Sequence, residues 1–229
     1  MLARQGYVVA APDHNDATCR VDGSIGFGSS NDNPSIFDPN AWNDSTYVDR
    51  KDDVELVISI MLSGNLSKII DPGSIGLAGH SLGGYTALGV AGGWSSWKDS
   101  RIKAALLLSP YSLPFSIKQT LSEVHVPLMY QGADGDIGIT PFLEGPKGAY
   151  QHSNAPKYFV RLRGGNHFSW TNLICAGQKT VADCLAASAN AALINAYSFA
   201  FLNFYLKHQN SSLLASNGAG LSAYIYQQS

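Results

Sequence analysis

The sequence has few charged residues and no strongly basic segment. Only 14% of its 229 residues are charged, against roughly 25% in average domains. The polar surface must therefore rely on Asn, Ser, Gly and Gln, a composition that favours an exported protein. The formal net charge is −2, and no basic run is present to neutralise a phosphate backbone, so nucleic acid is not expected as a partner.

Long apolar runs are also missing. Spanning a bilayer takes roughly 18–20 apolar residues. The longest candidate, AALINAYSFAFLNFYL, is shorter and is interrupted by Asn195, Ser198 and Asn203. The apolar part of YVVAAP is too short for the core of a signal peptide, and Pro12 ends it. We therefore expect no transmembrane segment.

The cysteines do not form a metal-binding pattern. Cys175 and Cys184 lie nine positions apart in CAGQKTVADC, and Cys19 is distant from both. The pair can be two free thiols or a disulfide that closes a small loop, which would stabilise the fold by roughly 2–3 kcal/mol. The spacing does not suit a zinc site. We expect no metal and no organic cofactor.

What the sequence does contain is an alternation of short apolar runs with helical patterns. The runs at residues 7–12, 74–80, 102–110, 126–132 and 157–163 are almost continuously apolar, as expected for strands buried on both faces. Helical spacing of apolar residues follows at 49–62, 81–93 and 193–204. Alternating strands and helices predict an α/β protein with a mostly parallel sheet flanked by helices.

Two segments lack any clear period. Residues 13–47 are rich in Asn, Asp, Ser and Gly, and loops of that length are usually functional or mobile. Residues 209–229 read as a loosely attached tail that ends in the apolar stretch LSAYIY. No internal repeat is evident, so we expect one domain over residues 1–229.

The sharpest chemical motif is GHSLG, in which Ser81 lies between Gly79 and Gly83. It falls where the expected strand 74–80 meets a helix of small residues, the context that G-x-S-x-G requires. The tight turn strains the serine backbone and exposes its hydroxyl at the carboxyl end of the sheet. We predict Ser81 to be a nucleophile, and His80 to be a packed, hydrogen-bonded residue that points away from it.

A nucleophilic serine needs a base, and the base needs an orienting acid. His167 follows the strand at 157–163 in GGNHFSW, and Asp134 and Asp136 follow the strand at 126–132 in GADGD. Either aspartate can be the acid at this stage. The order Ser, Asp, His along the chain is the one expected for an α/β-hydrolase.

Taken together, GYVVAAPDH, IGLAGHSLGGYTAL, GADGD and GGNHFSW resemble the serine esterases of the α/β-hydrolase superfamily. The likeness is greatest to the dienelactone-hydrolase, platelet-activating-factor acetylhydrolase and cutinase-like polyester-hydrolase group, and it covers most of residues 1–208. A G-A-x-x-D loop in related enzymes implies that Asp136 is the catalytic acid. Dienelactone hydrolases proper use cysteine as the nucleophile, so Ser81 departs from them.

The resemblance also implies an oxyanion hole. The backbone N–H of Leu82 is the expected first donor, because it follows the nucleophile. The second donor of the superfamily normally comes from a loop that precedes MLARQ, so the chain is expected to be shortened at its N-terminus, either by truncation or as a natural minimal form. The loop after residues 7–12, with Asn15, is the expected substitute.

We thus predict a serine carboxylic-ester hydrolase that acts on short-chain or aromatic esters through Ser81, His167 and Asp136. Tyr85, Phe168 and Trp170 neighbour these positions and are candidates for an apolar substrate pocket or for core packing. The alternatives are hydrolysis of amides, thioesters or polyesters, and a catalytically weak or silent binding protein. The expected partner is a small-molecule ester, and exposed sheet edges make a homo-oligomer plausible.

Overall fold

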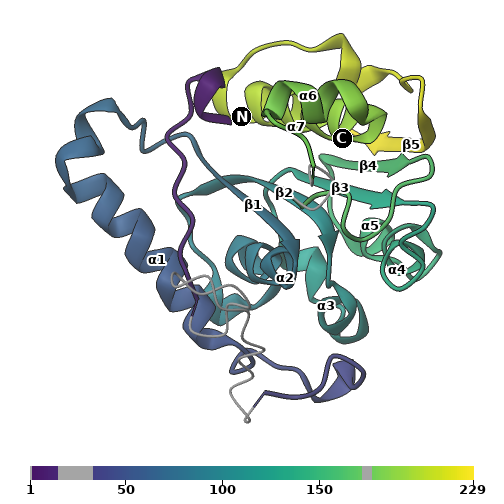
Figure 1. The fold of residues 1–229 in the computed structure, drawn as a ribbon. Coiled ribbons are helices and arrows are strands. Elements are labelled where there is room, and N and C mark those ends of the chain that lie inside the picture. Colours follow the sequence, from purple (N-terminus) through teal and green to yellow (C-terminus); the bar gives the residue numbers. More distant parts are fainter. Residues whose placement is uncertain (1, 15–32, 172–176) are drawn as a thin grey trace. The chain divides into compact units, whose positions relative to one another are not determined.

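The computed structural model describes residues 2–14, 33–171 and 177–229 (Figure 1). They belong to two compact units, residues 1–72 and residues 73–229. The single domain expected over the whole chain stays a prediction.

The described part of the first unit contains one long helix, α1 Val48–Ser63, which confirms the helix expected at 49–62. The same described part also contains short 3₁₀ turns at η1 Leu2–Gln5, η2 Pro39–Ala41 and η3 Asn65–Ile69. The strand expected at residues 7–12 is not formed, and Val8 and Val9 there are 43% and 55% exposed. An apolar run becomes a strand only where a neighbouring strand pairs with its backbone, and the sequence pattern contains no information on that neighbour.

The second unit is built on a five-stranded sheet whose spatial order follows the chain. Its strands are β1 Ile75–Ser81, β2 Ile102–Pro110, β3 Leu128–Ala133, β4 Lys157–Leu162 and β5 Leu221–Gln227. The strands β1 to β4 pair in parallel, and β5 runs antiparallel to β4. The mostly parallel α/β architecture expected from the alternating pattern is therefore present.

Helices connect the strands of this unit. They are α2 Leu82–Leu88, α3 Leu113–Lys118, α4 Thr140–Glu144, α5 Ala149–His152, α6 Val181–Ala187 and α7 Ala189–Lys207, with short turns at η4 Gly89–Gly93, η5 Ser95–Trp97, η6 Thr120–Glu123 and η8 Ser212–Ala215. The helix expected at 81–93 consists of α2 followed directly by the π turn η4, and Gly92 within that turn leaves the helical region with φ of 124°.

The helices α2 and α7 cover opposite faces of the sheet (Figure 1). A Cβ atom added to Gly76 would lie 2.7 Å from Leu206 of α7, whereas one added to Gly79 would overlap the carbonyl oxygen of Gly83 in α2. Gly76 and Gly79 are three positions apart on β1, so they face opposite sides of the sheet. The turn at Ser81 thus lies on the face of the sheet that α2 covers.

The C-terminal segment is an integral strand, so the loosely attached tail expected at 209–229 is wrong. In β5, Ile225 pairs with Phe159 and Tyr226 pairs with Tyr158, and the rings of Tyr158 and Tyr226 stack with centroids 6.1 Å apart. Leu221 at the start of β5 is only 4% exposed. The strand covers the edge of β4 that would otherwise be open.

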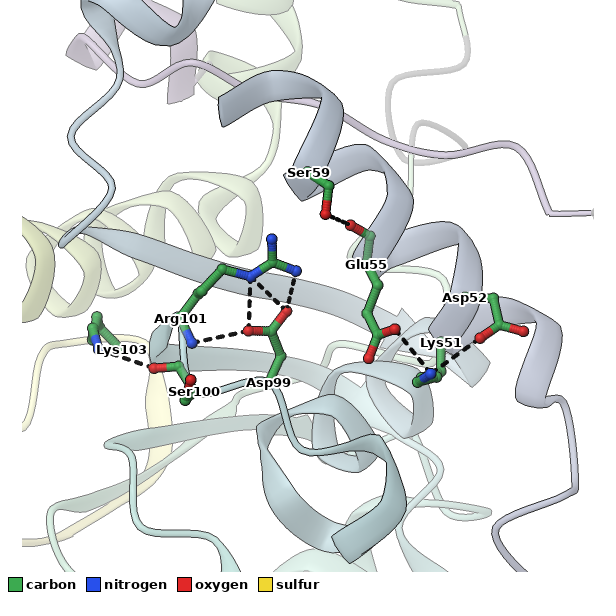
Figure 2. A network of polar contacts seen from close by, with 8 residues as sticks. All are labelled: Lys51, Asp52, Glu55, Ser59, Asp99, Ser100, Arg101 and Lys103. Carbon is green, nitrogen blue, oxygen red and sulfur yellow. Dashed lines mark hydrogen bonds and ion pairs between the residues drawn. The ribbon is translucent and has the colours of Figure 1, made fainter. Parts of the chain in front are cut away.

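Figure 2 shows two groups of polar contacts, one in each unit. On α1, Lys51 forms ion pairs with Glu55 at 2.8 Å and with Asp52 at 3.1 Å. Before β2, Arg101 hydrogen-bonds the Asp99 carboxylate with its side chain and its backbone N–H, and these bonds lower the pKa of Asp99. In the described part of the chain, no helix is both long and apolar enough to cross a membrane.

Candidate active site

Ser81 occupies a sharp turn between a strand and a helix. β1 ends at Ser81 and α2 begins at Leu82 with no residue between them. The backbone of Ser81 has φ of 54° and ψ of −116°, a conformation that costs a non-glycine residue about 1–3 kcal/mol and that is found mainly at functional sites. The turn therefore holds a serine hydroxyl at the carboxyl end of the sheet.

Two glycines allow this turn to close. Gly79 belongs to the GHSLG motif, whereas Gly84 lies just after it. Gly79 is required, because its missing side chain makes room for the backbone of Gly83 at the start of α2. Gly84 is required as well, since a Cβ atom there would lie 2.5 Å from the Cβ of Pro110. A Cβ atom added to Gly83 would have no neighbour within 4 Å, so packing does not exclude a side chain at that position.

His167 lies in the loop that follows β4, and its imidazole faces Ser81. Its Nε2 atom is 3.1 Å from the hydroxyl oxygen of Ser81. The side chain is 29% exposed, so part of it remains accessible. This distance is within hydrogen-bond reach, as proton transfer from a hydroxyl to a base requires.

Asp136 lies on the other side of the imidazole. It follows β3 in a turn closed by hydrogen bonds from its own N–H to Ala133 and from Thr140 N–H to its carbonyl. Its side chain is 3% exposed, and Oδ1 is 3.2 Å from Nδ1 of His167. A hydroxyl, an imidazole and a buried carboxylate in series can activate the hydroxyl as a nucleophile.

Asp134, the other candidate acid, has different partners. Its carboxylate lies 3.0 Å from Nε of Arg161 and accepts a hydrogen bond from the Ser222 hydroxyl. The hydrogen bond from Ser222 is the main cause that lowers the pKa of Asp134, with further contributions from Gly164 N–H and the nearby arginines. Of the two aspartates, only Asp136 contacts His167.

The structure adds a residue that the sequence analysis missed. Ser109, next to the last residue of β2, is fully buried and contacts both Asp136 and His167. Its Oγ donates to Oδ2 of Asp136 and lies 2.9 Å from Nδ1 of His167. A signal was available in LLLSP, where one polar residue ends an apolar strand next to the strand of Ser81.

A second set of polar contacts holds the loop that carries His167. The Nε2 atom of His80 is 2.8 Å from the carbonyl oxygen of His167, and the ring of His80 stacks on Trp170. Trp170 donates to the side chain of Gln131 on β3, which in turn donates to Ser198 on α7. Burial lowers the pKa of His80, so the ring acts here as a neutral hydrogen-bonding group.

The other predicted site residues are distributed unevenly. Tyr85 has no exposed surface and packs against Phe115, Trp94 and Trp97, so it belongs to the core rather than to an accessible pocket wall. Phe168 is 55% exposed, and its ring lies 5.8 Å from that of His167. Trp170 supports the loop through Gln131. Leu82 is the first residue of α2.

Two predictions fall wholly or partly outside the described residues. Asn15, the expected second oxyanion donor, is one of them. His14 just before it is described, and its Nδ1 lies 2.7 Å from the carboxylate of Asp53 on α1. Cys184 is disulfide-bonded, whereas Cys19 and Cys175 are not among the described residues. The pairing of Cys175 with Cys184 therefore stays a prediction.

Comparison with known proteins leaves the site to be interpreted from its own geometry. No family model matches the chain, and a search of the curated proteins finds no match. Within residues 2–14, 33–171 and 177–229, no group of three or more His, Cys, Asp or Glu side chains is arranged to hold a metal ion.

Proposed function

We propose that this chain is a serine carboxylic-ester hydrolase of the α/β-hydrolase type. Ser81 is the nucleophile, His167 the general base and Asp136 the orienting acid. The observation that carries the proposal is the series of contacts in which Nε2 of His167 is hydrogen-bonded to Ser81 and Nδ1 lies 3.2 Å from the carboxylate of the buried Asp136. The strained turn at Ser81 and the order of the three residues along the chain add support.

The distances support a reaction in two acyl-transfer steps. Nε2 of His167 accepts the proton of the Ser81 hydroxyl as Oγ attacks the ester carbonyl, and Asp136 stabilises the imidazolium that forms. Collapse of the tetrahedral intermediate breaks the ester bond, and the imidazolium protonates the leaving alkoxide. Water, deprotonated by His167, then attacks the acyl-serine, and the acid is released with Ser81 restored.

The oxyanion of the tetrahedral intermediate needs hydrogen-bond donors. The N–H of Leu82 is one candidate, because it lies at the first position of α2, where backbone N–H groups have no partner within the helix. Asn15 remains the candidate for the second donor. With one donor alone, turnover would be lower by about 10²–10³-fold, so the proposal is compatible with a slow enzyme.

An exposed apolar side chain beside His167 favours apolar substrates. The ring of Phe168 lies 5.8 Å from that of His167, and Phe168 is 55% exposed. Such a side chain suits a short acyl or aromatic group better than a charged one. Amides, thioesters and polyesters share the acyl chemistry, and a substrate panel separates them from simple esters.

The test is hydrolysis of p-nitrophenyl acetate and p-nitrophenyl butyrate by the wild-type chain and by Ser81→Ala. We expect Ser81→Ala to lower kcat by about four orders of magnitude or more. A fluorophosphonate probe should label the wild type at Ser81 and leave the variant unlabelled. Full activity in Ser81→Ala would refute the nucleophile, and a wild type that neither turns over nor labels would favour a silent binding protein.

A further inference from the structure

Ser109 is buried between the two residues that act on Ser81. It lies at the carboxyl end of β2, where the pairing with β1 shifts register so that Ser81 stands opposite Pro110. The side chain has no exposed surface, and its Oγ is the atom that contacts both Asp136 and His167. The hydroxyl is therefore shielded from bulk solvent in the folded chain.

The chemistry of the three groups sets the direction of each hydrogen bond. An ionised carboxylate can only accept, so the Ser109 hydroxyl donates its proton to Oδ2 of Asp136. The lone pairs of Oγ then face Nδ1 of His167, 2.9 Å away, and can only accept from an Nδ1–H. With the proton on Nδ1, the lone pair of Nε2 is directed to the Ser81 hydroxyl, as a general base requires.

The backbone at Ser109 indicates that this placement has an energetic cost. Its φ is 44°, in the left-handed region that non-glycine residues rarely adopt. A glycine would relieve that strain but would have no hydroxyl. A strained serine whose hydroxyl contacts Asp136 and His167 points to a role for that hydroxyl rather than for the backbone turn.

We propose that Ser109 is a positioning residue that fixes the Asp136 carboxylate and shares the Nδ1–H of His167 with it. The proposal rests on the proposed function of Ser81, His167 and Asp136. During attack, the imidazole becomes an imidazolium and its Nδ1–H donates more strongly. The two acceptors, Oδ1 of Asp136 and Oγ of Ser109, therefore stabilise the transition state more than the bound substrate, so their loss should lower kcat and leave KM almost unchanged.

The experiment compares Ser109→Ala, Ser109→Gly and a matched control, Ser112→Ala. Ser112 is 2% exposed, and its Oγ has no hydrogen-bond partner among the described residues, so it is a buried serine without a role in the site. We expect kcat for p-nitrophenyl butyrate to fall about 10- to 100-fold in both Ser109 variants, the range for loss of a hydrogen bond to a charged group. KM should stay within about twofold, and Ser112→Ala should match the wild type.

The glycine variant separates the hydroxyl from the backbone strain. If the hydroxyl acts as proposed, Ser109→Gly is as slow as Ser109→Ala although it relieves the strain. If Ser109 only maintains the turn, Ser109→Gly keeps the wild-type kcat, and the proposal is overturned. A drop in thermal stability with unchanged kcat in Ser109→Ala would overturn it as well.

A spectroscopic readout is independent of the choice of ester. The Nδ1–H of His167, assigned through ¹⁵N-labelled histidine, should give a low-field proton resonance in the wild type. We expect this resonance to move in Ser109→Ala and to stay in place in Ser112→Ala; an unchanged resonance in Ser109→Ala contradicts the proposal. Failure of the proposed function is distinguishable, because either Ser81→Ala would then retain the wild-type activity or the wild type itself would neither turn over esters nor be labelled, whatever Ser109 does.

Discussion

Asp134 and Asp136 are the same residue type two positions apart, yet their surroundings have nothing in common. The chain turns after Ala133 at the end of β3, so Asp134 extends to Arg161 and Ser222 while Asp136 is buried beside His167 and Ser109. These partners are 27 to 88 positions away along the chain. Their chemistry, rather than the local GADGD motif, decides which carboxylate can orient an imidazole.

This difference gives a prediction with a built-in control. Replacing Asp136 by Asn should lower kcat by about three to four orders of magnitude, because the amide no longer holds the base in the right tautomer or stabilises the imidazolium. Asp134→Asn removes the same charge on the same loop and should keep kcat within about threefold. Steady-state kinetics of the two variants check it, and equal losses would contradict the assignment of Asp136.

At the scale of elements, the loop after β4 is positioned from the α7 side of the sheet. His80 precedes Ser81 on β1, but its ring is directed to the carbonyl of His167 and to Trp170. Trp170 is linked through Gln131 on β3 to Ser198 on α7. One face of the sheet thus carries the support for the loop, while Ser81 turns to the other face with α2.

The burial of His80 predicts a dependence of stability on pH. Its pKa in the folded protein is lowered from the ordinary value of 6.5, mainly by burial. The unfolded chain therefore binds more protons between that lowered pKa and 6.5, so the free energy of unfolding falls as the pH falls through this window. His80→Gln should show a smaller fall between about pH 7.5 and about pH 5.5, measured by urea denaturation.

His125 provides the matched control, because it is an exposed histidine of the same unit. His125→Gln should retain the pH dependence of the wild type. We also expect His80→Gln to lower kcat several-fold through a less well-ordered His167. If the two variants lose stability in parallel with the wild type on acidification, the burial of His80 is not the cause.

At the scale of the whole chain, the parallel sheet of the second unit brings together residues that are remote in sequence. Ser81, Ser109, Asp136 and His167 follow or end four successive strands. Because parallel strands have their carboxyl ends at the same edge, these side chains meet there without any local signal linking them. The antiparallel β5 pairs with β4 and forms the edge of the sheet opposite to β1.

The closing strand should contribute strongly to stability. Truncation after residue 219 removes β5 and exposes the edge of β4. It also removes Leu221, an apolar side chain that is only 4% exposed. We expect the free energy of unfolding to fall by at least about 2 kcal/mol, the burial energy of one large apolar side chain, as measured by urea denaturation. Truncation after Gln227, the last residue of β5, is the control and should have little effect.

The sequence by itself determined the local features of this protein. Apolar periodicity located β1 to β4, α1 and α7, because backbone geometry imposes those periods on any segment that buries one or both faces. The GHSLG motif located the turn at Ser81, and of its two glycines Gly79 is the one that the close approach of the backbone requires. His167 could be predicted as the base because it follows an expected strand.

Only the tertiary structure decided the features that depend on a distant partner. Residues 7–12 and 221–227 are both short apolar runs, but only the second pairs with a strand of the sheet. Ser109 is an ordinary serine in sequence, and it becomes part of the site because β2 ends between β1 and β3. Pairing and contact between remote segments are set by the free energy of the whole fold, which no local pattern contains.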